Sequence, residues 1–357
     1  MTTRLPKLFL IFLLIIHLNK LYSQSDSVKI CYERAYVDIK EAMDSGITFS
    51  FKQICFLTEN TFFSNKLDFV KFNTSIQQLK SMTKAWMNAN PLKNYRYGDS
   101  INFHTNLAIY KILKDTIKIV TGDTNVFAHL PYTYDFDDFS GSKDWSKMFV
   151  TKLLATHQGN CHSLPYLYKI LADELGATCW LSTAPNHIYI KNRCKKIGWY
   201  NTELTSGEFP IDAWITASGY IPVKAVQTGL YMDTLSNQQA IALCVLDLAK
   251  GYESQTHNYY DVFIIKCCDL VLKYHPVNAQ ALLLKAETLK RIYEKQHAEK
   301  DTAATRTYSD MEQLYAKLFD LGYREMPDKM YLQWLQSVTK ERNKFSNKQM
   351  QATLTNK

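Results

Sequence analysis

The sequence is poor in the residues that mark fibrous and disordered chains. Its 357 residues include only 12 Gly and 9 Pro, and 21% of them are charged. This composition excludes a collagen-like chain, a coiled coil and a mostly disordered protein. Apolar residues make up 46% of the chain, which is enough to build the core of one large domain or of two ordinary ones. We therefore expect a compact, folded protein.

A strong charge of either sign is also missing. Lys and Arg number 42 and Asp and Glu number 34, so the net charge is +8. Three of the positive charges (Arg4, Lys7 and Lys20) lie in an N-terminal segment that we expect to be removed, and subtracting them leaves +5. So small an excess does not indicate a nucleic-acid partner.

The N-terminal segment carries an apolar run that is short for a membrane span. It extends from Leu8 to Leu18, about half of the roughly 20 residues that a transmembrane helix needs. A basic start, a short apolar run and then small and polar residues are typical of a secretory signal peptide. We expect residues 1–23 to be this signal, and the mature protein to be periplasmic or secreted with no membrane span after cleavage. An uncleaved anchor is the alternative.

The cysteines show neither a disulfide framework nor a zinc-binding spacing. There are eight of them, an ordinary number for this length, and several lie in apolar runs that are typical of buried thiols. A bridge between Cys179 and Cys194 stays open. No C-x-x-C or H-x-x-x-H pair is present, so we expect no metal site. We expect no cofactor either.

The first two thirds of the chain predict helices followed by strands. Apolar residues recur at helical spacing from Ser27 to Met87. Another helix is expected to begin around Cys161 and to end at Gly176. Three β-prone runs follow it, at residues 177–183, 187–191 and 198–204. A helix followed by antiparallel strands is typical of an α+β fold.

The remainder of the chain predicts helices alone. We expect four of them, at residues 239–252, 260–274, 279–293 and 305–321. The second ends at His275–Pro276, and the Ala-rich third places the small Ala286 where a close helix approach is needed. This pattern resembles a degenerate tetratricopeptide repeat (TPR). We expect a TPR-like region over residues 237–357 with a disordered C-terminal tail; an unrelated helical bundle is the alternative.

Three short segments carry the residues of a thiol chemistry: Gln158–Ser163, Pro185–Ile190 and Trp199–Thr205. In the first, a Gly turn precedes a Cys at a helix start, where the helix dipole favours the thiolate. In the second, a His opens a strand and can accept the thiol proton. In the third, a polar or acidic side chain on the next strand can orient that imidazole.

These segments provide the candidate site residues. Cys161 is the candidate nucleophile, His187 the general base and acid, and Glu203 the orienting carboxylate. Asn201 is an alternative third member, since some thiol enzymes use Asn there. Gln158 and the backbone N–H of Cys161 are candidate donors to an oxyanion.

The region from Trp145 to Thr216 resembles the transglutaminase-like superfamily. In that superfamily a Cys at a helix start, a His on one strand and an Asp on the next form a papain-type triad, and the third segment often has the pattern W-x-x-x-D-P-T. Here Trp199, Glu203 and Thr205 align with its W, D and T. Glu takes the place of Asp, and Leu the place of Pro. The combination with a TPR-like tail is similar to a bacterial branch of the superfamily.

The resemblance implies a fold and an activity. The fold would be a papain/transglutaminase-like α+β domain over residues 24–236, with its catalytic core at about 145–216 and helices preceding that core. The activity would be that of an exported thiol enzyme acting on amide or peptide bonds of a protein or peptide, by hydrolysis or acyl transfer. A protein partner on the TPR-like region is a further expectation. The alternative is an inactive fold that serves as a periplasmic protein-binding scaffold.

Overall fold

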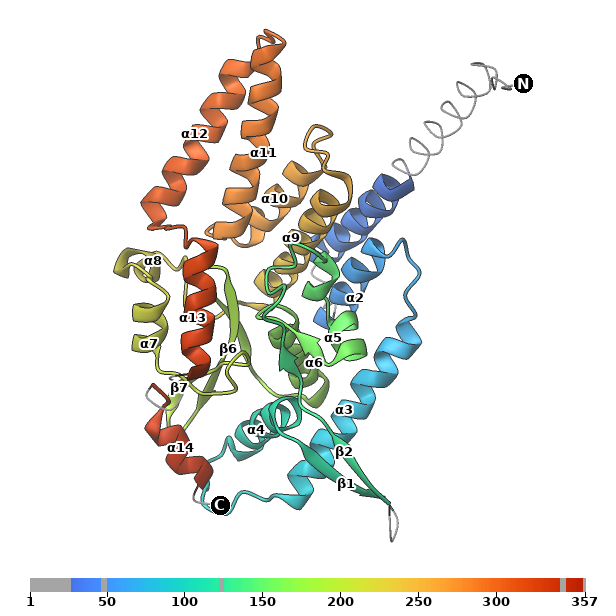
Figure 1. The fold of residues 1–357 in the computed structure, drawn as a ribbon, viewed down its shortest axis with the longest axis vertical. Helices are drawn as coiled ribbons and strands as arrows, with labels where there is room; N and C mark the ends of the chain where they lie inside the picture. The colour runs from blue at the N-terminus through green and yellow to red at the C-terminus, as the bar shows by residue number, and fades with distance from the viewer. Residues whose placement is uncertain (1–26, 46–49, 122–124, 341–344, 356–357) are drawn as a thin grey trace, which may run out of the picture.

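The computed structural model describes residues 27–45, 50–121, 125–340 and 345–355. The expected signal peptide, residues 1–23, lies outside this part of the chain. Helices predominate in the described residues and are combined with small sheets (Figure 1), so the fold is α+β. None of the described helices has both the length and the apolar character that crossing a bilayer requires.

The N-terminal part consists of helices. One covers residues 27–44 and is followed by α2 (Phe51–Phe62), α3 (Phe69–Ala89) and α4 (Ser100–Lys114). The Asp68 side chain caps α3 by accepting hydrogen bonds from the backbone N–H groups of Val70 and Lys71, which satisfies two donors that the helix itself leaves free.

The described strands form three separate sheets. Two of these are two-stranded: β1 (Ile117–Thr121) pairs antiparallel with β2 (Asn125–His129), and β3 (Thr133–Tyr134) pairs parallel with β4 (Gln158–Gly159). The third sheet is antiparallel in chain order: β5 (Trp180–Ala184), β6 (His187–Cys194) and β7 (Gly198–Thr202). These three strands match the three expected β-prone runs.

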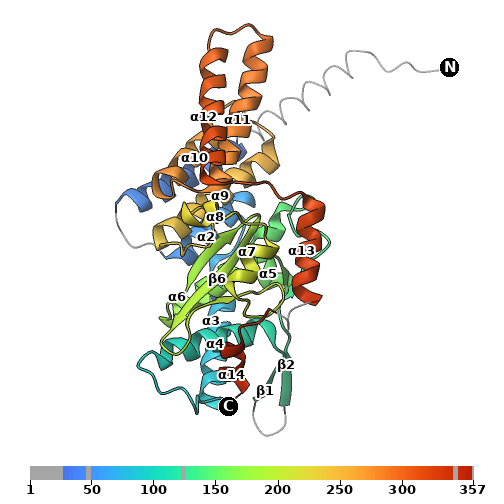
Figure 2. The ribbon, with the colours of Figure 1, turned by 90° about the vertical axis from the view of Figure 1, so that its left-hand side faces the viewer.

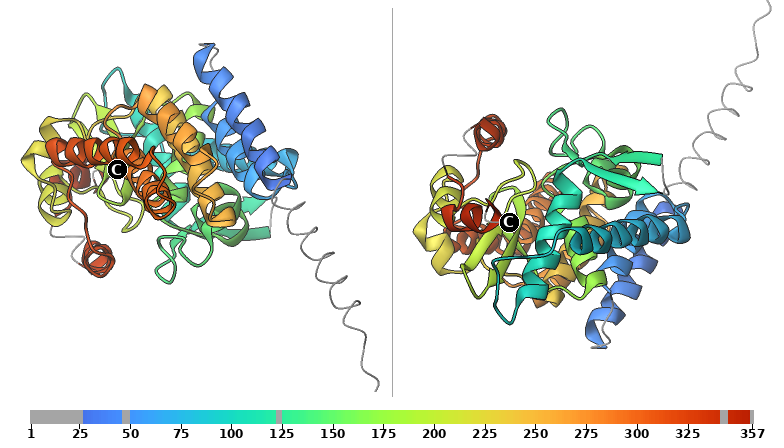
Figure 3. Two further views of the ribbon diagram at one scale, coloured as in Figure 1. Left: turned by 90° about the horizontal axis from the view of Figure 1, so that it is seen from above. Right: turned by 90° about the horizontal axis from the view of Figure 1, so that it is seen from below.

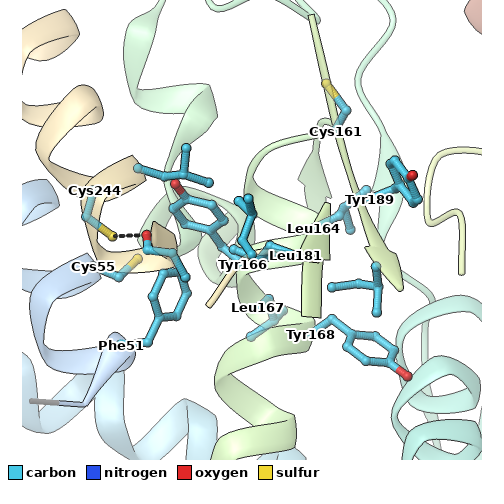
Figure 4. Packing of buried hydrophobic residues seen from close by; sticks show 14 of the residues in the cluster. Phe51, Cys55, Cys161, Leu164, Tyr166, Leu167, Tyr168, Leu181, Tyr189 and Cys244 are labelled. Carbon is cyan, nitrogen blue, oxygen red and sulfur yellow. Dashed lines mark hydrogen bonds between the residues drawn. The ribbon is translucent and has the colours of Figure 1, made fainter. Parts of the chain in front are cut away.

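Helix α6 (Ser163–Leu175) packs between this sheet and the helices. It follows the short 3₁₀ helix η1 (Trp145–Met148) and α5 (Val150–Thr156). Figure 4 shows Leu164 and Leu167 beside Leu181 of β5, and Tyr166 directed towards Phe51 of α2. The helix ends at Gly176, whose φ of 70° is left-handed and suits glycine.

The C-terminal part contains more helices than the sequence indicates. The short helices α7 (Asp212–Ser218) and α8 (Val223–Gln227) come first, and the four expected helices follow as α9 (Asn237–Thr256), α10 (Phe263–Tyr274), α11 (Ala279–Ala298) and α12 (Ala304–Leu321). The pair α11 and α12 extends away from the rest of the molecule (Figure 1).

The expectation of a disordered tail needs correction. Two more helices, α13 (Asp328–Lys340) and α14 (Lys348–Thr355), occupy that part of the chain. Tyr331 and Trp334 of α13 are buried against the core, and such tertiary contacts stabilise a short helix that local sequence would leave marginal. This part is also not purely helical, because Ser346 forms an isolated β-bridge with Pro210.

One hydrophobic core extends across the expected domain boundary at residue 236. Its buried members include Tyr32, Cys55 and Leu167 on one side of the boundary and Val245 and Phe263 on the other. Seen from above, the N-terminal helices lie beside α9 and α10 (Figure 3). The first helix and α10 are joined by the edge-to-face contact of Tyr32 with Phe263, whose ring centroids are 5.9 Å apart. The helical region is therefore part of the same packed body.

All eight cysteines lie in the described residues, and all are free thiols. This includes Cys179 and Cys194, for which the sequence left a bridge open.

Candidate active site

Cys161 lies in a tight turn between β4 and α6. The turn needs glycine at position 159, because a Cβ there would be 2.5 Å from Oγ of Ser163 and 2.7 Å from Cδ1 of Leu153. The side-chain oxygen of Asn160 accepts hydrogen bonds from the backbone N–H groups of His162 (3.0 Å) and Ser163 (3.1 Å). Asn160 therefore holds the turn that leads into α6 and fixes Cys161 next to the positive end of the helix.

His187 and Glu203 are brought together by the pairing of β6 with β7. Ile190 pairs with Thr202, so continuing this register places Glu203 opposite Tyr189 and on the same face of the sheet as His187. Nε2 of His187 is 2.6 Å from Oε2 of Glu203. The other carboxylate oxygen accepts a hydrogen bond from the backbone N–H of Thr205 at 2.7 Å. Both side chains are buried.

A tyrosine that the sequence did not indicate completes the site. The hydroxyl of Tyr331, on α13, lies 3.2 Å from Sγ of Cys161 and 3.2 Å from Nδ1 of His187. The spacing of Tyr331 and Trp334 could have predicted an amphipathic helix. It could not have shown where this helix docks, because 144 residues separate Tyr331 from His187.

The charges of the site favour a thiolate at Cys161. Burial raises the pKa of the thiol, but the hydrogen bond and charge of His187, and then the hydroxyls of Tyr331 and Tyr134, outweigh it and hold the pKa below its ordinary value. In contrast, burial raises the pKa of Cys55 and of Cys244 well above the ordinary value. A thiolate is the form of cysteine that acts as a nucleophile.

The imidazole and the carboxylate are held in their charged forms. Burial lowers the pKa of His187, but the charge of Glu203 and the hydrogen bonds to Cys161 and Glu203 raise it to about 10. Burial raises the pKa of Glu203, but the charge and hydrogen bond of His187 bring it below its ordinary value. The interactions of the three groups thus favour a buried series of thiolate, imidazolium and carboxylate.

Two sequence candidates lie elsewhere. The side-chain amide of Asn201 donates hydrogen bonds to the carbonyl oxygen of Pro210 (2.9 Å) and to Oδ1 of Asp212 (2.8 Å). The residue that contacts His187 is therefore Glu203 and not Asn201. Gln158 is exposed on β4 and does not line the cavity beside Cys161, so its side chain is not positioned to act as an oxyanion donor.

A cavity of about 320 Å³ is lined in part by Cys161 and His187. Its walls include Ile188 of the sheet and Leu243 and Leu246 of α9, and two charged residues of α9, Asp247 and Lys250, also line it. A mostly apolar cavity of this size with a few polar groups is typical of a small-ligand site. The C-terminal helical region thus supplies one wall of the candidate active site.

His162, next to the candidate nucleophile, anchors α6 to α9. Its Nδ1 donates a hydrogen bond to the carbonyl oxygen of Met148 (2.9 Å), and its Nε2 donates to Oδ1 of Asp247 (2.8 Å). Tyr166 donates to the other oxygen of Asp247 at 2.9 Å. Burial lowers the pKa of His162, but the charge of Asp247 outweighs this effect and leaves the pKa above its ordinary value. The pair is therefore a buried imidazolium and carboxylate.

No group of three or more metal-ligating side chains occurs within the described residues. Comparisons of the chain with family models, with curated proteins and with solved structures find no match. A functional assignment must therefore be argued from the geometry of the site.

Proposed function

We propose that the protein is an exported thiol enzyme with a papain-like, transglutaminase-like core that acts on amide or peptide bonds. The observation that carries this proposal is the buried series of Cys161, His187 and Glu203. In it the cysteine with the lowered pKa adjoins a histidine whose far nitrogen is 2.6 Å from a carboxylate oxygen. This arrangement of nucleophile, base and orienting group is the one that covalent acyl transfer needs.

The chemistry follows from the charges. The thiolate of Cys161 attacks the carbonyl carbon and forms a C–S bond. The C–N bond then breaks, and the imidazolium of His187 gives its proton to the leaving amine. The resulting thioester is attacked by water or by a second amine, whose proton returns to His187. The products are a carboxylic acid or a new amide and the free thiolate.

The position of the cavity supports a substrate that reaches from the sheet to α9. The two groups that react line the cavity, and the rest of its lining comes mostly from apolar side chains. The acyl part of a protein or peptide substrate would occupy this cavity. The TPR-like helices then help to form the site, in addition to any protein partner that they bind.

The first test is the pH dependence of iodoacetamide alkylation at Cys161, followed by peptide mapping. A thiolate forms above the lowered pKa of Cys161, and the imidazolium persists until about pH 10, the pKa of His187. We therefore expect alkylation to begin below the pH at which an ordinary thiol reacts, and the ion pair to persist up to about pH 10. In His187→Ala the burial remains but the charge is lost, so the inflection should move above that of an ordinary thiol.

The matched control is His129→Ala. His129 is also partly buried, and its Nε2 donates a hydrogen bond to the carbonyl oxygen of Ile112 at 2.8 Å. This variant should keep the inflection of the parent. An inflection that does not respond to His187→Ala would contradict the proposal and favour the scaffold role. Mass spectrometry of the intact protein after incubation with a peptide mixture would then detect an acyl group on Cys161 if the thioester forms.

A further inference from the structure

Helix α13 places a side chain against both of the groups that must react. Nε2 of His187 is hydrogen-bonded to Glu203, so Nδ1 is the nitrogen that exchanges a proton with Cys161. The Tyr331 hydroxyl is 3.2 Å from this nitrogen and 3.2 Å from the sulfur. A substrate needs its carbonyl carbon at the sulfur and its amine at Nδ1. Tyr331 therefore occupies the place of the scissile bond.

The helix is held there by an aromatic face. Tyr331 is 2% exposed and Trp334, one turn later, is 6% exposed. The ring centroid of Trp334 is 4.9 Å from that of His187, edge to face, and 6.2 Å from that of Trp214 on α7. Tyr331 packs on Phe139 with centroids 5.3 Å apart. Figure 2 shows α13 along one side of the molecule next to α7.

Polar contacts add little to this docking. Among the α13 side chains that the structure describes, the hydroxyl of Tyr331 makes the hydrogen bonds to the core. The indole N–H of Trp334 is buried without a partner, which weakens the docked state because a buried donor has lost its water. A helix held by two aromatic side chains and an unsatisfied donor can leave at lower cost than the elements beneath it.

From these contacts we infer that α13 is an autoinhibitory segment that covers the reactive pair and must move away before a substrate can bind. The inference rests on the proposed function, because it concerns access to the same cysteine. In the closed form the site already favours the thiolate, but Tyr331 lies against the sulfur. The segment that covers the pair is α13, residues 328–340. Its connection to α12 through residues 323–327 has no helical structure, so α13 can move away without disturbing α12.

The test compares alkylation rates of Cys161 in full-length variants. Replacing Tyr331 and Trp334 together by Ala removes the aromatic face and should raise the alkylation rate at pH 7 by about tenfold or more. Alkylation should still begin at a lower pH than that of an ordinary thiol. The matched control replaces Gln333 and Gln336, which are exposed on the same helix, and should leave the rate unchanged within about twofold.

Two outcomes would overturn the inference. An unchanged rate would show that α13 does not restrict access. The Tyr331 hydroxyl helps to lower the pKa of Cys161, so a small alkaline shift of the inflection is expected; a rate below that of the parent would show that this support outweighs any covering of the sulfur. Failure of the proposed function would give a different result. The pH inflection of alkylation would then be unchanged by His187→Ala, both in the parent and in the double variant.

A measurement on the unaltered chain covers the case in which the double variant does not fold. Low urea concentrations should expose Cys161 to alkylation, together with faster amide hydrogen exchange in residues 328–340, before Cys244 reacts. Cys244 is completely buried at 0% exposure and reports global unfolding. Simultaneous labelling of Cys161 and Cys244 would mean that α13 does not open separately, and it would contradict the inference.

Discussion

At the scale of single residues, Glu203 determines the charge of His187. Apart from burial, the charge of this carboxylate is the largest influence on the pKa of His187, which it raises. The carboxylate is itself fixed by the backbone N–H of Thr205. Glutamate has one more methylene than aspartate, and here it reaches the imidazole from the residue directly after β7.

Glu203→Gln should therefore reduce the reactivity of Cys161 more than any change at Asn201. The amide keeps the shape but loses the charge, so the pKa of His187 falls towards or below its ordinary value. We expect the alkylation inflection to shift to higher pH and turnover, once a substrate is known, to fall by roughly 10²- to 10⁴-fold.

Asn201→Ala is the comparison. It removes hydrogen bonds to Pro210 and Asp212 and should reduce the free energy of unfolding by about 1–3 kcal/mol. The inflection should stay in place. A shift of equal size in both variants would mean that Glu203 has no special part in orienting His187.

The three candidate residues could be predicted from sequence because each has a local signal. Cys161 follows a glycine turn at a helix start, His187 opens a strand, and Glu203 directly follows the next strand of a short antiparallel sheet. Adjacent strands and the preceding helix bring such positions together. Tyr331 had no such signal, since its position depends on how α13 docks after more than 100 intervening residues.

At the scale of elements, the turn before α6 connects stability with reactivity. Asn160 in this turn is completely buried at 0% exposure. Besides accepting hydrogen bonds from the backbone of His162 and Ser163, its side chain donates one from the amide to the carbonyl oxygen of Phe139 at 3.1 Å. The same side chain thus joins the helix start to the loop that packs on Tyr331.

Asn160→Ala should lower the free energy of unfolding by about 1–3 kcal/mol, since it leaves the buried groups that bind this side chain without partners. It should also slow the alkylation of Cys161 at pH 7, because the sulfur is no longer fixed at the helix start. Denaturant unfolding and alkylation measure the two effects. Ser236→Ala removes the cap of α9 and should cost about 1 kcal/mol while alkylation is unchanged. Equal slowing in both variants would refute a local effect.

Helices with an apolar face repeating at helical spacing were predictable, and those fixed mainly by tertiary contacts were not. The strands β5, β6 and β7 and the helices α9 to α12 match their expected ranges within a few residues. The two-residue strands β3 and β4 pair over Tyr134 and Gly159, too short a stretch to produce a pattern. Similarly, α13 depends on the aromatic surface formed by Phe139 and Trp214.

At the scale of the whole molecule, a buried ion pair joins the candidate catalytic core to the helical region. His162 and Asp247 belong to opposite sides of the expected boundary, and their side chains are 14% and 12% exposed. Both nitrogens of His162 donate hydrogen bonds, and Asp247 balances the positive charge of the imidazolium.

Asp247→Ala should reduce the free energy of unfolding by about 3–5 kcal/mol, since it leaves a buried charge unpaired. The control is Asp269→Ala, which removes a salt bridge to Lys285 whose aspartate side chain is 55% exposed and should cost less than about 1 kcal/mol. Denaturant unfolding of both variants gives the comparison. Similar small losses would show that the two parts are not coupled through this pair.

Because α13 follows the three site residues in the sequence, it is also synthesised after them. Cys161, His187 and Glu203 all precede it, and position 331 comes 128 residues after position 203. At about 5–20 residues per second, the ribosome needs roughly 6–25 seconds to make that stretch. The nucleophile and its base are therefore made well before their cover. If folding keeps pace with synthesis, each new molecule is reactive first and latent afterwards, which is the reverse of a zymogen with an N-terminal prosegment.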